Sequence, residues 1–356
     1  MIAPAACFAM SMLLNRRHVL SLGGAAAAAL LLGRGLPPVR ARPWPTIPRG
    51  DQRLVLISDL NASYGSTSYI PQVHRGVELV QALQADLVLC GGDMVAGQKH
   101  GLSAAHLDAM WQAFDRQVLT PIRSAGEPFA PTMGNHDASS SRGPQGYSFG
   151  LDRERAERFW RGQQAGLGLN LVEASRFPFR YSLRQGDLFA VVIDASSAVV
   201  PEQDWVWAEA QLASPAAREA RLRLVMGHLP PYGLSQGRDR AGEVLHQPER
   251  LTQLMERQGV HLYVSGHHHA WYPGRVGRTD LLSLGAMGSG PRRLLRSELP
   301  PIQTITVLDL FRGQNQLVET TVELNGLQVL ATANLPPSLQ PSMAPLIRRR
   351  DTPIPL

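Results

Sequence analysis

The sequence has little cysteine: its 356 residues include two, Cys7 and Cys90. Cys7 lies in an N-terminal segment that we expect to be removed. This leaves no internal pair and excludes a disulfide framework in the mature chain. Cys90 ends the apolar run 86–90, a position typical of a buried, unreactive thiol. An oxidising compartment is still compatible with a single thiol of this kind.

Charged residues are also scarce, at 18% of the chain, whereas 44% of the residues are hydrophobic. This balance excludes a disordered chain and predicts a globular protein with a large core. The formal net charge of +6 overstates the basic character, because residues 1–41 hold four arginines and no acidic residue. Without them the formal charge is +2, so we do not expect nucleic acid as a partner.

The N-terminal segment has no apolar run long enough to span a bilayer, but its regions follow one another as in a signal peptide. Arg16 and Arg17 precede an Ala- and Gly-rich apolar run over 19–32, and Val39-Arg40-Ala41 follows as a cleavage site. The paired arginines resemble a twin-arginine signal. We expect residues 1–41 to be removed, the protein to be periplasmic or extracellular, and the mature form to have no membrane span. An uncleaved anchor or a buried helix is the alternative.

The rest of the chain predicts one large domain over residues 51–332. Residues 42–50 are rich in proline and predict a linker. Residues 333–356 contain several prolines and the run Arg348-Arg349-Arg350, and predict a loosely attached tail.

Short apolar runs alternate with amphipathic segments in this domain, which predicts an α/β fold with a parallel or mixed sheet. Ser103 is the expected N-cap of the second helix. Strands are expected at 53–58, 86–90, 128–133, 180–184, 188–193, 221–226 and 261–265, and helices at 69–83, 103–119, 153–163, 203–213 and 248–257.

Five short polar clusters come directly after predicted strands. In open α/β sheets, ligands bind at the carboxyl ends of the strands, so we expect these clusters to converge. Each alone is more typical of a turn or a helix cap, but five in order favour a functional site. The clusters are Asp59-Leu60-Asn61, Gly91-Gly92-Asp93, Gly134-Asn135-His136-Asp137, Gly227-His228 and Gly266-His267-His268-His269.

The clusters offer the donor atoms of a metal site. Mixed carboxylate, amide and imidazole donors suit Mn, Fe, Zn or similar ions rather than a thiolate structural zinc. His267 and His269 are two residues apart and would point the same way on an extended segment, with His268 pointing away. Two metals bridged by Asp93 would clamp a phosphate and lower the pKa of a water between them to give hydroxide.

These clusters resemble the motifs of the calcineurin-like metallophosphoesterase family, which are DxH, GD, GNH followed by D or E, a single His, and GHxH. Here they read SDLN, GGD, GNHD, GH and GHHH. The resemblance implies a two-sheet α/β sandwich with helices on its outer faces. It also implies a centre of two divalent or trivalent metal ions (Mn, Fe or Zn) at the sandwich edge and a small phosphate ester as substrate.

The resemblance also assigns roles. Asp59 and His269 would bind the first metal, and Asp93 would bridge the two. The second metal would take Asn135, His228 and His267. His136 would be the general acid that protonates the leaving oxygen, oriented by Asp137 or Asp59.

Asn61 departs from the family pattern, which usually has His there. Three outcomes are open: coordination through the amide oxygen, which favours a harder ion, a weak first site filled only with substrate, or a water in its place. The related purple acid phosphatases also lack this His and use a Tyr three residues after the second Asp, where this chain has Ala96. We include Asn61 among the expected ligands.

The expected function is hydrolysis of phosphate monoesters or diesters. A non-catalytic metal-binding scaffold of the same fold is the alternative to which Asn61 points, and an exported nuclease is a third. Arg142, Arg238 and Arg240 are candidate substrate contacts, because guanidinium groups suit phosphate, although most loop arginines are simply solvated.

Overall fold

A computed structural model describes residues 44–342 and 344–356. The predicted signal peptide lies outside the described residues, and so does its predicted cleavage point before Arg42. Residues 44–50 of the predicted linker form no helix or strand, and Ile47 is buried against the domain. No described helix is both long enough and apolar enough to cross a membrane.

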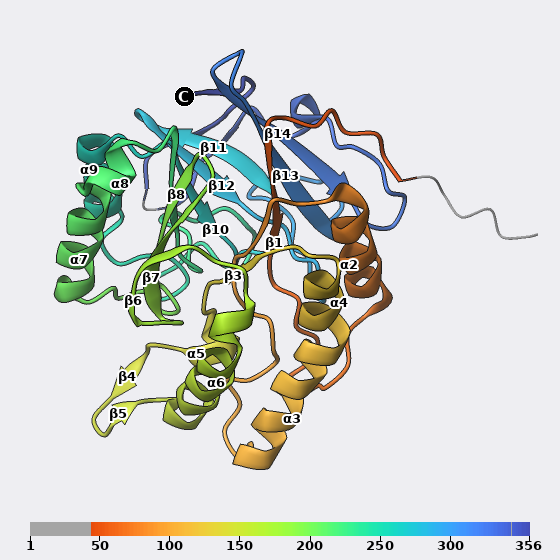
Figure 1. The fold of residues 1–356 in the computed structure, drawn as a ribbon, viewed down its shortest axis with the longest axis vertical. Helices are drawn as coiled ribbons and strands as arrows, with labels where there is room; N and C mark the ends of the chain where they lie inside the picture. Colours follow the sequence, from red (N-terminus) through yellow and green to blue (C-terminus); the bar gives the residue numbers. More distant parts are fainter. Residues whose placement is uncertain (1–43, 343) are drawn as a thin grey trace, which may run out of the picture. The chain divides into compact units, whose positions relative to one another are not determined.

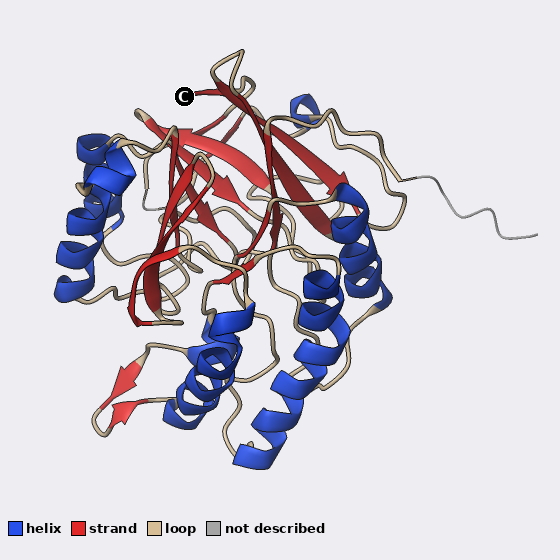
Figure 2. Cartoon of the chain, viewed as in Figure 1, coloured by secondary structure: helices blue, strands red, loops and turns tan. Residues whose placement is uncertain are grey.

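Two mixed β-sheets pack against each other with helices outside them (Figure 1 and Figure 2), so the predicted two-sheet α/β sandwich is confirmed. The six-stranded sheet has the order β17-β14-β13-β1-β2-β3, and the nine-stranded sheet has the order β15-β16-β11-β12-β10-β9-β8-β7-β6. The strands of the first are β1 (Gln52–Ile57), β2 (Leu87–Cys90), β3 (Phe129–Pro131), β13 (Thr304–Phe311), β14 (Gln316–Glu323) and β17 (Ile354–Pro355). Those of the second are β6 (Leu171–Arg176), β7 (Arg180–Gln185), β8 (Leu188–Val192), β9 (Leu222–Met226), β10 (Leu262–Ser265), β11 (Tyr272–Val276), β12 (Thr279–Ser283), β15 (Ser338–Leu339) and β16 (Ile347–Arg349).

The helices lie outside the two sheets, with α2, α3 and α4 beside the first and α7, α8 and α9 beside the second (Figure 1). They are α2 (Pro71–Leu83), α3 (Ala104–Phe114), α4 (Thr120–Ser124), α5 (Asn135–Ala138), α6 (Gly150–Gln163), α7 (Glu202–Leu212), α8 (Pro215–Arg218) and α9 (Pro248–Gln258). A small hairpin, β4 (Arg142–Gly143) and β5 (Gly146–Tyr147), lies between α5 and α6 in the chain. Ser103 caps α3 as expected, because its Oγ accepts a hydrogen bond from the His106 N–H.

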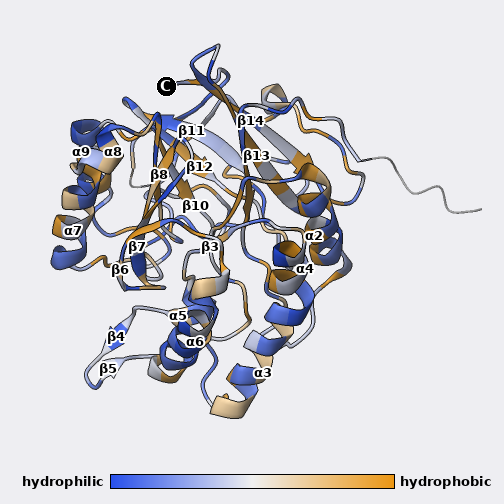
Figure 3. Ribbon diagram, viewed as in Figure 1, coloured by the Kyte–Doolittle hydropathy of each residue, from blue (hydrophilic) through white to orange (hydrophobic). Residues whose placement is uncertain are grey.

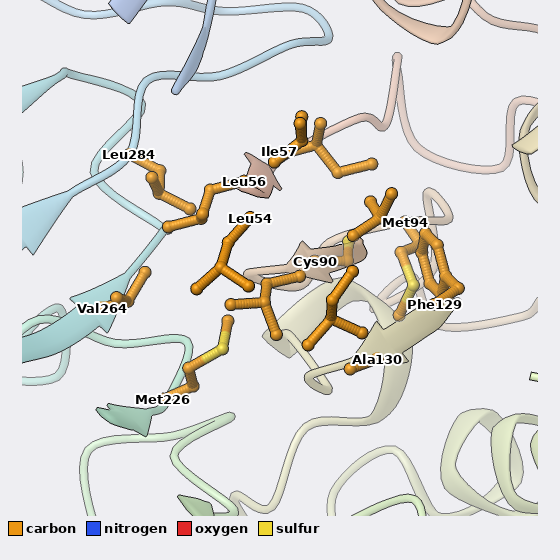
Figure 4. Packing of buried hydrophobic residues seen from close by; sticks show 14 of the residues in the cluster. Leu54, Leu56, Ile57, Cys90, Met94, Phe129, Ala130, Met226, Val264 and Leu284 are labelled. Atoms are coloured by element: carbon orange, nitrogen blue, oxygen red, sulfur yellow. The ribbon is translucent and has the colours of Figure 1, made fainter. Parts of the chain in front are cut away.

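The core fills the space between the sheets, where strand alternation sends every second side chain. In β8, Leu188, Ala190 and Val192 face the first sheet, whereas Phe189 and Val191 face α7 and α9. Figure 4 shows residues of both sheets meeting in this core, and Figure 3 shows the central strands as mostly apolar and α6 as mostly hydrophilic. The inter-sheet residues include Leu54, Leu56, Met226 and Val264. Cys90 is free and buried, as predicted, and burial raises the pKa of its thiol.

The prediction of a loosely attached C-terminal tail is wrong. β16 pairs with β11 in the second sheet, and β17 pairs with β14 in the first. Ile347 and Ile354 are buried, and Arg350 forms ion pairs with Glu319 and Asp280. The prolines of this segment separate short strands rather than keep it in solvent, and the apolar residues between them provide the attachment.

The parallel strands of both sheets end at one edge, so the residues that follow them lie close together there. β1, β2 and β3 are parallel in the first sheet, and β8, β9, β10 and β12 are parallel in the second. The Met287 N–H donates to the Ser58 carbonyl and the Gly288 N–H to the Asp59 carbonyl, so the segment after β12 joins the segment after β1. The predicted convergence of strand ends therefore spans both sheets.

Candidate metal centre

Two groups of buried side chains at this edge could each hold a metal ion, and both include Asp93. One group is Asp93, His228 and His267, and the other is Asp59, Asp93 and His269. Within each group the possible ligand atoms all lie within 4.8 Å of one another. The structure thus brings together residues that are up to 210 positions apart in sequence, with one carboxylate common to both groups.

The backbone at these residues is unusual. Asp59, Asp93, His267 and His269 have φ values of 52°, 55°, 65° and 52°. This left-handed conformation costs a residue with a Cβ about 1–2 kcal/mol. It turns the chain sharply at the strand end, so that each side chain points along the sheet edge into the site. Such conformations persist where the surrounding structure holds them, and they cluster at functional sites.

Glycines beside the ligands leave room for the carboxylates. A Cβ on Gly134 would clash with the carboxylate and backbone N of Asp93. A Cβ on Gly266 would clash with Ser58 Oγ and the Asp59 carboxylate. The glycines of the GNHD and GHHH clusters are therefore required by the close approach of another segment.

The hydrogen bonds of two histidines leave Nε2 facing oxygen atoms. His228 Nδ1 lies 2.8 Å from the Gly91 carbonyl, which can only accept, so Nδ1 is the donor. Its Nε2 lies 3.3 Å from Asp93 Oδ2 and 3.0 Å from Asn135 Oδ1. His269 has the same arrangement, with Nδ1 2.8 Å from the Gly290 carbonyl and Nε2 3.2 Å from Asp59 Oδ1. A carbonyl on the far nitrogen is the usual support of a metal-binding imidazole.

These converging lone pairs require a positive charge between them. Burial lowers the pKa of His228, but Asp93 and further acceptors outweigh burial and raise the pKa to about 9. Burial alone would raise the pKa of Asp93, yet His228 and His136 bring the pKa below its usual range. Without metal, a proton on His228 supplies the charge, and a bound cation would replace that proton. The donor set therefore fits a metal ion.

Gln98 fixes the amide of Asn135. Asn135 Nδ2 donates to Gln98 Oε1 at 2.6 Å, which turns the amide oxygen toward His228 Nε2. Gln98 has a left-handed φ of 61°, and its N–H donates to Asp152 Oδ1. Sequence reasoning missed Gln98, because its role depends on the turn of the loop after Asp93 and not on a motif.

His136 lies next to the two groups, with Nε2 3.9 Å from Asp93 Oδ2. The Gly97 carbonyl orients its ring through Nδ1 at 3.1 Å, so the prediction that Asp137 or Asp59 would do so is wrong. Asp137 instead accepts the N–H groups of Met94, Val95 and Gly134 and ties the GGD loop to the GNHD loop. The Tyr64 ring covers His136, with the ring centroids 4.9 Å apart.

His267 and His268 face different surroundings. His268 points away from the two groups, as predicted: Nδ1 accepts from the Leu234 N–H, and Nε2 bonds the Glu243 carbonyl. His267 Nε2 lies 2.9 Å from Glu243 Oε2 and 3.0 Å from Arg238 Nη1. Neither contact was predicted, because no motif marks Glu243.

Asn61 is buried at the same edge, and its backbone is hydrogen-bonded there. Its N–H donates to the Asp93 carbonyl at 3.1 Å, and its carbonyl accepts from Ser289 Oγ at 3.0 Å. Ala96, where the purple acid phosphatases have Tyr, is buried and offers no ligand atom. The role of the Asn61 side chain as a ligand stays a prediction.

Comparison with known proteins shows to which family these clusters belong. The calcineurin-like phosphoesterase model matches residues 52–271, which contain all five clusters. The chain belongs to this family. A search of curated protein sequences found no match.

Two solved structures are similar to this chain at the level of the fold. One is a purple acid phosphatase from yellow lupin (Lupinus luteus) seeds, with a TM-score of 0.59 and 17% identity over 78% of this chain. The chain spans about half of that protein, 52% of its length. The other is a dimetal phosphatase from Danio rerio, with a TM-score of 0.50, 13% identity and coverage of 78% of this chain and 98% of that one.

A pocket of about 680 Å³ adjoins the two Asp/His groups through His267. Asn135, His136 and His267 line it. All three arginines that were expected to contact substrate line it, and so does Arg292, which sequence reasoning missed. Its lining also includes hydroxyl groups from the segments after α5 and β8, namely Ser139, Ser140, Ser141, Ser196 and Ser197. The rule that polar residues follow strand ends could have found Ser196 and Ser197.

Proposed function

We propose that this calcineurin-like phosphoesterase hydrolyses small phosphate esters at a centre of two divalent or trivalent metal ions (Mn, Fe or Zn). The observation that carries the proposal is the pair of buried Asp/His groups that share Asp93. One member of these groups, His267, lines a polar pocket together with four arginines, as a site for a phosphate ester requires.

In this proposal the residues divide between two ions. Asp59 and His269 hold the first, with Asn61 offering its amide oxygen. The second takes Asn135, His228 and His267, and Asp93 binds both. When bound, such ions polarise phosphoryl oxygens and lower the pKa of a bound water.

His136 is the proposed general acid. His136 lines the pocket, and the Gly97 carbonyl holds its Nδ1–H, so the ring turns Nε2 toward Asp93. A proton on Nε2 can pass to the leaving oxygen of an ester bound there. Tyr64 lies over the ring and limits its rotation.

The test is a panel of esters against protein reconstituted with Mn, Fe or Zn. We expect turnover of 4-nitrophenyl phosphate or bis(4-nitrophenyl) phosphate that is lost on chelation and restored by added metal. Stoichiometric metal binding without turnover of any ester would favour the scaffold alternative. Turnover restricted to DNA or RNA would favour the nuclease.

We also propose that the protein is exported and acts outside the cytoplasm. The support is the sequence alone: paired arginines, a short apolar run and a cleavage site. N-terminal sequencing of the protein recovered outside the cytoplasm should begin near Arg42. Recovery of Arg16 and Arg17 in that form would contradict cleavage.

A further inference from the structure

Three arginines gather around one carboxylate in the wall of the pocket. Arg238 Nη1 lies 2.8 Å from Glu243 Oε2, and Arg240 Nη2 lies 3.0 Å from Glu243 Oε1. Arg292 and Arg142 line the same pocket, and the Arg142 guanidinium lies 4.1 Å from the centre of the Tyr147 ring. Glu243 is the only carboxylate among the residues that line the pocket in the described part of the chain, so positive charge is in excess.

Among the three arginines around Glu243, Arg292 has the positive charge that is least compensated by a nearby acidic partner. Its guanidinium makes no hydrogen bond or ion pair within residues 44–342 and 344–356, and its Nε is buried without a partner. Burial lowers the pKa of Arg292, and the charges of Arg238 and Arg240 lower it further, against the opposing effect of Glu243. A half-buried guanidinium held beside two others is unfavourable unless an anion completes the group.

The arginine group adjoins the proposed metal centre. Arg238 Nη1 lies 3.0 Å from Nε2 of His267, so an anion bound at His267 lies within reach of this guanidinium. The loop that carries Arg238 and Arg240 is held in place, because Asp239 accepts from the N–H and the Oγ of Ser342. The C-terminal segment thus fixes these charges beside the site.

We propose that Arg238, Arg240 and Arg292 form an anion subsite that selects the dianionic phosphoryl group of a monoester over the monoanionic group of a diester. The proposal rests on the proposed phosphoesterase activity. Above the second pKa of phosphate, near 6, a monoester carries about two negative charges and three terminal oxygens. A diester carries one charge, and its second substituent replaces an oxygen that a guanidinium would bind.

The test compares Arg292→Met with Arg293→Met at fixed metal content. Arg293 is the adjacent residue, is exposed, pairs with Glu298 and does not line the pocket, so it is the matched control. We expect R292M to lower kcat/KM for 4-nitrophenyl phosphate by about tenfold or more, the weight of one charge-assisted contact. The value for bis(4-nitrophenyl) phosphate should fall by about threefold or less, and R293M should match the wild type. Equal loss on both esters would overturn the proposal.

Two further measurements keep the test decisive. Arg240→Met changes an exposed side chain, so it spares folding and should lower the ratio of monoester to diester efficiency in the same direction by about two- to fivefold. If the wild type turns over neither ester, the proposed function fails and titration with inorganic phosphate decides the subsite alone. The wild type should then bind phosphate at least about fivefold more tightly than R292M. Equal affinities would overturn the subsite.

Discussion

At the scale of single residues, the site depends on backbone conformations that its side chains do not favour. Asp59, Asp93, His267 and His269 all adopt the left-handed region. Their combined strain is opposed by hydrogen bonds such as the one from the His267 N–H to the Asp59 carboxylate. The strained backbone at this edge lowers the stability of the fold, but it lets the donor atoms that a cation needs converge.

His136→Ala should lower kcat by about 10²–10⁴-fold while metal content stays near the wild-type value, because the residue is proposed to move a proton and not to bind metal. The measurement pairs steady-state kinetics with metal analysis, and the exposed His74→Ala on α2 is the control. A loss of metal in parallel with activity would make His136 a ligand.

Gln98→Ala should weaken binding of the second metal by about 10–100-fold, because the Asn135 amide loses the acceptor that turns its oxygen inward. Gln98→Glu keeps an acceptor and should retain most of the affinity. Titration of metal-free protein by calorimetry measures both variants. Unchanged affinity in the alanine variant would show that the amide needs no such support.

Glu127→Gln should stabilise the fold at pH 8 more than at pH 5. Glu127 is buried, and burial raises its pKa to about 7 despite a hydrogen bond from the Ala85 N–H. The folded state thus holds the proton more tightly than the unfolded state, so this stability is complete below about pH 4.5 and is lost as pH rises to about 7. Free energies of unfolding at the two pH values measure the effect, with the exposed Glu78→Gln as control. A gain that is equal at both pH values would contradict the assignment.

At the scale of elements, the C-terminal segment belongs to the fold and reaches the site. β16 and β17 extend both sheets, and Ser342 holds the loop of Arg238 and Arg240. This attachment could not be predicted from the sequence, because short strands between prolines give no periodic pattern.

Ile347→Ala should therefore cost about 2–4 kcal/mol in free energy of unfolding, as expected for a buried core residue. The neighbouring Leu346 is 38% exposed, and Leu346→Ala should change stability by less than about 0.5 kcal/mol. Denaturant unfolding compares the two variants. Equal and small effects would restore the interpretation of a loosely attached tail.

Helix α3 shows how far a periodic pattern carries. The expected stripe of Leu107, Met110, Trp111, Phe114 and Val118 is buried throughout. The helical segment nevertheless continues past the predicted end at 119, because a π-helical stretch over Asp115–Leu119 joins α3 to α4. The periodicity of the sequence determines the apolar face of the helix, whereas packing against the rest of the fold determines that the helical segment continues past residue 119.

At the scale of the molecule, the sequence predicts most of the sandwich and the residues that converge at its edge, because strand ends and the polar residues after them are local signals. Each of the five clusters follows an observed strand. The supporting contacts could not be predicted, since Gln98, Glu243 and Arg292 reach the site through loop conformations that depend on the whole fold. The hairpin β4–β5 was missed because its strands are short, and the edge strand β6 because it is only partly buried.

The central claim is that Asp93 unites two cations at this edge, and metal stoichiometry tests it most directly. Elemental analysis of reconstituted, active protein should give about two ions per chain in the wild type and a loss of both in Asp93→Ala, because one carboxylate serves both sites. Full activity with fewer than about one ion per chain, or an Asp93→Ala variant that keeps both ions, would contradict the account.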